Sequence, residues 1–230
     1  MVSTTVLSTI HIELQVELIF SLIIIALLSL FFIYAGKKIM IADPLQKPKG
    51  IVLVCETGIE MVYNYMKSIM PSQFEKNYYP YFAMMFVYLI VANLSGLIGF
   101  DAPTSNYSIT LAITLITFIL IQYNALKKKG FFKYVWDTVW PPTNILSVLS
   151  PLISISMRLF GNILSGSILM TLIYQFTAWI SFHVINFNFL GPIIAPVFHC
   201  YFDIFAGCIQ TLVFVTLSSI LIMMENEDDE

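Results

Sequence analysis

The chain has 230 residues, of which 58% are hydrophobic and 11% are charged, and its formal net charge is -3. Soluble domains carry about 25% charged residues. The composition therefore excludes an ordinary soluble protein and indicates a protein that crosses a membrane several times. The small net charge favours no charged partner, and no nucleic-acid partner is expected.

Five long apolar segments define the predicted membrane helices. They are residues 18–36, 79–100, 107–126, 144–180 and 189–224. A perpendicular crossing needs about 20 residues, so the last two segments are predicted to be strongly tilted or to lie partly along the membrane plane. The predicted fold is an all-α polytopic membrane protein with one membrane domain, residues 1–230. It has two helices within 79–126 and ends in a long tilted hairpin over 142–224.

The lysines predict the orientation of these helices. All of them lie in the connections after the first and third apolar segments, within 37–76 and 127–133. The positive-inside rule places both connections in the cytoplasm, so the N-terminus is expected outside and the acidic C-terminal tail inside. Glu13 and Glu17 stand where a signal peptide would be basic. The first segment is therefore interpreted as a retained helix.

Residues 49–70 are predicted to form an amphipathic surface helix. Glu56, Glu60 and Lys67 follow helical spacing on one face, and apolar residues such as Val54 and Val62 occupy much of the other. This pattern predicts a helix on the cytoplasmic membrane surface. A helix packed on the protein itself would have the same pattern, and the periodicity does not separate the two arrangements.

Catalytic and metal-binding motifs are missing from the sequence. It contains no GxxxxGK phosphate loop, no GxSxG elbow and no HExxH pair. Cys55, Cys200 and Cys208 match no metal or redox spacing and are interpreted as small apolar side chains. We therefore expect no catalytic site, no cofactor and no metal, and we predict transport, or support of transport.

Only two formally charged side chains occur between positions 140 and 224, Arg158 and Asp203, and Arg158 is the only arginine of the chain. An unpaired charge in the middle of a membrane costs roughly 3 to more than 10 kcal/mol, so such groups are functional candidates by default. The alternative is a structural ion pair between the two residues, tying two helices together.

Helical spacing places further polar residues beside these two charges. The two predicted faces contain Arg158, Asn162 and Ser165 on one helix and His199, Asp203 and Gln210 on the other. Such faces can line water-filled cavities, and neighbouring small residues would let another helix approach closely. A fixed cation among donors and acceptors predicts the handling of a small ion, a proton, with carboxylates supplied by a second protein.

The stretch SMRLFGNILSG, residues 156–166, closely resembles the fourth-segment motif of subunit a of F-type ATP synthases. VANLSGLIGF at 91–100, APTSNYSITLAIT at 102–114 and the following KKKGFF also resemble segments of that family. The similarity extends over about 50–224. It implies five membrane helices, one surface helix and a tilted hairpin facing a rotating c-ring.

The resemblance also implies a mechanism. Arg158 would be the stator arginine, which attracts each ring carboxylate, favours its ionised form and separates two aqueous half-channels. Asn162 and Gln210 fall on family positions that line this region, and Asp203 stands where relatives carry an ionisable residue. The implied partners are the c-ring proteolipid subunits, the peripheral-stalk b subunits and membrane lipids, in a bacterial plasma membrane.

The chain departs from the family pattern at several polar positions. Ser167 stands where many relatives have an acid or a histidine, and Asn106 stands where many bacterial relatives have an aspartate. We therefore expect Asp203 to carry more of the proton relay. The channel lining is predicted to include Asn93, Asn106, Ser165, Ser167 and His199.

Two other functions stay open on the sequence. An independent secondary transporter or channel would need its own substrate site and typically shows repeat symmetry, and neither is visible. A non-transporting membrane scaffold would use Arg158 and Asp203 only as a pair.

Overall fold

The computed structural model describes residues 15–41, 47–70, 72–98, 102–141, 143–184 and 189–224. These ranges fold almost entirely into helices, and no β-strand occurs within them. The predicted all-α class is therefore confirmed. The connection at Asp101 and the acidic tail, whose orientation the sequence predicted, lie outside the described residues.

Five spans are long and apolar enough to cross a membrane, as predicted. They are α1 (Val16–Ile41), α3 (Ser72–Leu94) with the 3₁₀ turn η1 (Ser95–Ile98), α4 (Tyr107–Lys129), α6 (Thr143–Val184), and a continuous rod made of α7 (Leu190–His199), the π-helix η3 (Cys200–Ala206) and α8 (Gly207–Met224). A bilayer core offers no water to backbone N–H and C=O groups, so apolar runs of this length satisfy those groups within helices.

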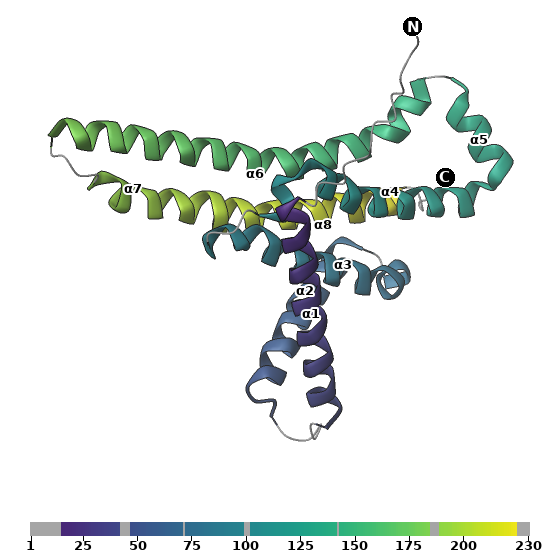
Figure 1. The fold of residues 1–230 in the computed structure, drawn as a ribbon. Coiled ribbons are helices and arrows are strands. Elements are labelled where there is room, and N and C mark those ends of the chain that lie inside the picture. Colours follow the sequence, from purple (N-terminus) through teal and green to yellow (C-terminus); the bar gives the residue numbers. More distant parts are fainter. Residues whose placement is uncertain are drawn as a thin grey trace, which may run out of the picture.

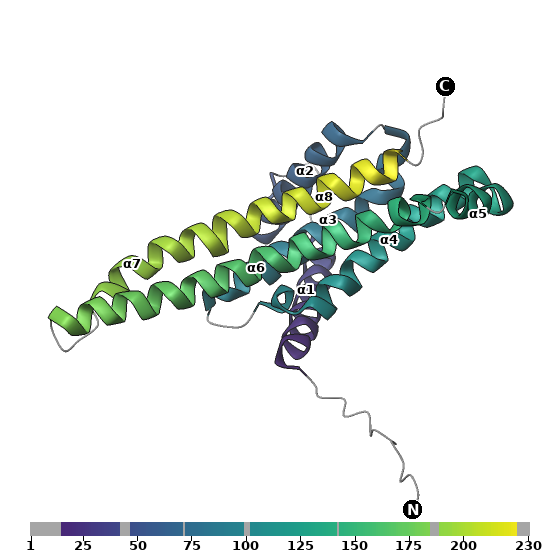
Figure 2. The same ribbon diagram turned by 90° about the horizontal axis from the view of Figure 1, so that it is seen from above.

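The hairpin is formed by α6 and the rod. Helix α6 has 42 residues and the rod has 35, which at 1.5 Å per residue correspond to about 60 and 50 Å, against about 30 Å of bilayer hydrocarbon. Both views show the two members running antiparallel, side by side, and crosswise to α1 (Figures 1 and 2). This arrangement positions the polar residues of α6 opposite those of the rod.

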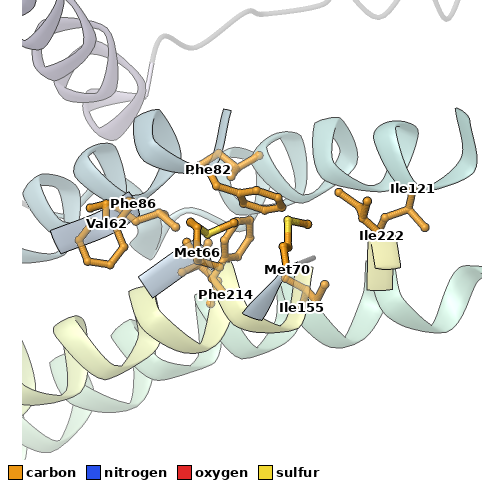
Figure 3. Packing of buried hydrophobic residues seen from close by; sticks show 13 residues of the cluster. Val62, Met66, Met70, Phe82, Phe86, Ile121, Ile155, Phe214 and Ile222 are labelled. Carbon is orange, nitrogen blue, oxygen red and sulfur yellow. The ribbon is translucent and has the colours of Figure 1, made fainter. Parts of the chain in front are cut away.

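A buried hydrophobic cluster joins the hairpin to α2 (Ile51–Ile69), α3 and α4 (Figure 3). Its centre contains Val62 and Met66 of α2, Phe82 and Phe86 of α3, and Phe214 of α8. One side of α2 is thus packed on the protein, which was the alternative to a surface helix. Other apolar side chains of α2 are exposed, and its position at a membrane surface stays a prediction.

Helix α1 is attached differently from the others. Only Ser21 and Ala35 of this helix are buried, and the Ser21 hydroxyl shares a 2.8 Å hydrogen bond with the hydroxyl of Tyr88 on α3. Lipid tails are as apolar as the side chains of a membrane helix, so the hydrophobic effect does not drive such helices together. They associate instead through close packing at small residues and through hydrogen bonds.

The sequence did not predict α5 (Phe131–Val139), a short helix between α4 and α6. Gly130 precedes it with φ of 77°, a conformation that glycine adopts without strain. The Tyr134 hydroxyl donates a hydrogen bond to Oε1 of Gln122, which ties α5 back to α4. Nine residues are too few to stand out in a search for membrane spans.

Candidate functional site

The register of the hairpin brings Arg158 level with Gln210. The Asn162 side-chain amide reaches the carbonyl of Ala206 at 3.5 Å, and a Cβ at Gly166 would lie 3.6 Å from the Cβ of Phe202. Both contacts belong to one antiparallel register, in which residues four before Asn162 and four after Ala206 face each other. Asp203, seven residues before Gln210, lies about 10 Å further along the hairpin.

Arg158 has no acidic partner in the described part of the chain. Its side chain is exposed on α6, and no described carboxylate comes within 4.0 Å of the guanidinium. The ion pair with Asp203 that the scaffold function required is not formed: Asp203 lies about 10 Å further along the hairpin, and its carboxylate pairs with His199. The charge of Arg158 is therefore not neutralised by a described acidic side chain, and it is exposed on the surface of the hairpin.

Asp203 ends a row of three hydrogen-bonded side chains. Its Oδ2 lies 2.6 Å from Nδ1 of His199, and Nε2 of that histidine lies 2.8 Å from the hydroxyl of Tyr174 on α6. The side chains of His199 and Asp203 are 33% and 23% exposed. The row thus links the two members of the hairpin and is partly exposed at the surface of the chain.

A recess of about 560 Å³ opens beside this row. Its lining consists of Gly96, Leu97, Tyr174, Pro196, His199, Cys200 and Ile204. A neighbouring hollow of about 350 Å³ shares Tyr174, Pro196 and His199 with it. We call these two connected spaces the hairpin recess. It lies where η1 meets the rod, and a Cβ at Gly96 would be 3.8 Å from Cγ of Asp203.

The rod is not a regular α-helix at this point. The π-helix Cys200–Ala206 contains Asp203, and such irregular turns are frequent at functional sites. Since a π-helix has more residues per turn than an α-helix, the spacing of eleven from His199 to Gln210 does not keep both on one face. His199 and Asp203 stay together beside the recess, whereas Gln210 is buried, with 7% of its surface exposed.

Asn93, predicted as channel lining, lies in a buried polar network. Its side-chain amide donates to the carbonyl of Gly207 at 3.2 Å and to the Thr211 hydroxyl at 3.4 Å. Its Oδ1 accepts from the Thr104 hydroxyl at 3.0 Å. Only 2% of Asn93 is exposed, so these contacts fix α3 against α8 and the 3₁₀ turn η2 (Pro103–Ser105).

The other predicted lining residues are dispersed. Asn106 caps α4 by accepting from the Ser108 N–H at 2.9 Å, and its amide donates to Gln15. Ser165 and Ser167 are exposed, and each hydroxyl donates to a carbonyl of its own helix. Of the predicted set, the structure joins His199 to Asp203 by a hydrogen bond, and the register of the hairpin sets Arg158 at the level of Gln210.

Sequence reasoning missed two residues of the site, Tyr174 and Gly96. Tyr174 lies seven residues after Ser167 and so falls on its face of α6, a spacing that could have drawn attention to it. Gly96 is part of the VANLSGLIGF stretch, but only the fold shows that its backbone approaches Asp203.

Comparison with known proteins agrees with this architecture. The sequence profile of the ATP synthase A chain family matches residues 18–223. The chain is 34% identical over 217 residues to ATP synthase subunit a of Mycoplasma genitalium, covering 85% of this chain and 74% of that protein. It is 32% identical over 218 residues to subunit a of Mycoplasmoides gallisepticum, with 85% and 72% covered.

A more distant relative is subunit a of the ATP synthase of Helicobacter pylori strain P12. The identity is 28% over 169 residues, covering 68% of this chain and 73% of the relative. With the family profile matched over most of its length, the chain belongs to the family of ATP synthase subunit a, the proton-translocating stator subunit of the membrane sector.

Proposed function

We propose that this chain passes protons to and from a ring of carboxylates through two half-channels that Arg158 separates. The observation that carries the proposal is the state of Arg158, which is exposed on the hairpin and has no acidic partner among the described side chains. An arginine stays protonated at any physiological pH, so its charge is available to a carboxylate on another subunit.

A permanent cation at this position acts on a passing carboxylate in two ways. It favours the ionised form, so the carboxylate releases its proton as it approaches. It also repels protons that would cross directly between the half-channels. Asn162, which is partly buried near this level of the hairpin, supplies an amide group that can hold the carboxylate by a hydrogen bond. Gln210 lies at the same level but is buried.

The hairpin recess is proposed as the mouth of one half-channel. It adjoins η1 and the rod, near connections that carry neither lysine nor arginine, so the positive-inside rule puts its mouth on the outer side of the membrane. Asp203 is hydrogen-bonded to His199, which lines the recess, and is the candidate proton carrier between that water and the ring.

The proposed assembly places this chain beside a c-ring of two-helix proteolipids, with peripheral-stalk b subunits and lipids around the remaining faces. The N-terminus would be outside and the C-terminus in the cytoplasm of a bacterium. The chain contributes no covalent chemistry of its own and couples proton flow to rotation.

The test is ATP-driven proton pumping by the assembled complex in inverted membrane vesicles, comparing wild type with Arg158→Ala. Loss of pumping with normal assembly is the expected result, since the ring carboxylates then lose their counter-charge. Unchanged pumping would rule the proposal out. Transport by the purified chain alone in liposomes would favour an independent channel instead.

A further inference from the structure

The row Tyr174–His199–Asp203 along the hairpin recess has a defined order of donors and acceptors. Oδ2 of Asp203 and Nδ1 of His199 are 2.6 Å apart, a distance that two acceptors without a proton between them do not adopt. One proton therefore lies between these atoms. A second proton lies between Nε2 and the Tyr174 hydroxyl, which are 2.8 Å apart.

We infer that Tyr174 and His199 are positioning residues for Asp203, an inference that rests on the proposed function. The Tyr174 hydroxyl donates to Nε2 and so fixes the histidine tautomer that carries its proton on Nδ1. Nδ1–H then donates to Oδ2 and holds the carboxylate in one orientation. The tyrosine acts on Asp203 only through the histidine, because it stands at the far end of the row.

The second carboxylate oxygen is left to exchange protons with water. Both carboxylate oxygens of Asp203 would lie 3.9 Å from a Cβ at Gly96, whose backbone lines the recess. Oδ1 is the oxygen that does not take part in the hydrogen bond with His199. A hydronium ion in the recess gives one proton to Oδ1 and becomes water. The same proton then leaves Oδ1 for a ring carboxylate, while the proton on Nδ1 stays in place.

The surroundings of the row contain few competing groups. Of the residues that line the recess, only Cys200 can titrate besides Tyr174 and His199. The neighbours contributed by η1, Gly96 and Leu97, carry no titratable side chain. Arg158 lies at the level of Gln210, about 10 Å along the hairpin from Asp203, and forms no ion pair with it. The histidine is therefore the nearest partner available to orient Asp203.

Two substitutions of His199 separate orientation from proton carriage. In His199→Asn the amide nitrogen takes the place of Nδ1 and can still donate to Oδ2, but it cannot titrate and does not reach Tyr174. His199→Leu removes the donor. In assembled complexes, with pumping normalised to the amount of the subunit present, we expect His199→Leu to lose about ten-fold in rate and His199→Asn to recover most of it.

Tyr174→Phe removes one oxygen atom. It tests the positioning of Asp203 even if the His199→Leu variant does not assemble. We expect it to slow pumping several-fold in the wild-type background and to have no effect in the His199→Asn background. Equal losses in His199→Asn and His199→Leu would overturn the inference, because a non-titrating donor would then not suffice. An undiminished effect of Tyr174→Phe in the His199→Asn background would also overturn it.

The outcome is separable from that of the proposed function. Pumping that is lost in Arg158→Ala but unchanged in His199→Leu and Tyr174→Phe removes only the positioning roles. Pumping that persists in Arg158→Ala removes the proposed function itself.

Discussion

Asn93 and Gly207 form a close contact between α3 and α8. The Asn93 amide donates to the Gly207 carbonyl at 3.2 Å, and a Cβ on the glycine would lie only 3.1 Å from the Cβ of Asn93. Gly207 is also the first residue after the π-helix. α3 and α8 therefore approach closely at the start of α8, which lies between the recess and the level of Arg158 along the rod.

Gly207→Ala is expected to destabilise the protein by roughly 1–3 kcal/mol, because the added methyl group overpacks this contact. Thermal unfolding of the purified chain in detergent measures the effect. The matched control is Gly58→Ala in α2, where a Cβ meets no atom within 4 Å and alanine should stabilise the helix by up to about 1 kcal/mol. Equal melting temperatures for the two variants would contradict the prediction.

Asp203→Asn is expected to slow proton pumping by a hundred-fold or more, roughly the contribution of a proton-transferring side chain, without preventing assembly. The amide oxygen still accepts a hydrogen bond from His199, so the local structure is kept while the carboxylate is lost. Ser165→Ala is the control, since the Ser165 hydroxyl donates only to the Asn162 carbonyl of its own helix. A wild-type rate in Asp203→Asn would remove this residue from the relay.

A large side chain at Gly96 should obstruct the hairpin recess. A Cβ there would lie 3.8 Å from Cγ of Asp203, an ordinary contact, so Gly96→Ala should keep its pumping rate. Gly96→Leu adds atoms beyond that Cβ and is expected to exclude water from the carboxylate, which lowers the rate. If both variants pump equally fast, water does not reach Asp203 by this route.

The cysteines provide a test of orientation. Cys200 is exposed and lines the recess, whereas Cys55 is buried and Cys208 is half-buried. A membrane-impermeant maleimide should therefore label Cys200 from the outer side of intact cells, because a thiol reacts as its thiolate and needs water. Labelling should disappear in Cys200→Ser. Labelling only from the cytoplasmic side would reverse the predicted topology.

The membrane spans could be predicted from the sequence because each depends on one simple quantity, the length of an apolar run. An apolar run is long enough to cross a bilayer or it is not, and 144–180 and 189–224 are visibly too long to stand upright. The structure lengthens the first of these by five residues, to Thr143–Val184, and shortens the second by one, to Leu190–Met224.

The site was only partly predictable. Arg158 stood out because a lone charge in an apolar tract is costly, and His199 and Asp203 are joined by a simple helical spacing. Tyr174 and Gly96 escaped because their roles depend on contacts between α6, η1 and the rod. Asn93 was predicted to line the channel, but its side-chain amide forms structural hydrogen bonds with neighbouring residues. A polar residue in a membrane helix can therefore have a structural role alone.

The π-helix has a consequence for the two ends of the rod. One extra residue in a turn rotates all following side chains by about 100° about the helix axis. The side chains of α7 at the recess and those of α8 at the level of Arg158 therefore point in directions that a regular helix would not give them. Deleting a single residue within Cys200–Ala206 would restore a regular helix and swing Gln210 to a different neighbour. The π-helix thus changes which face of the rod presents its side chains, without a hinge, a break or a loop.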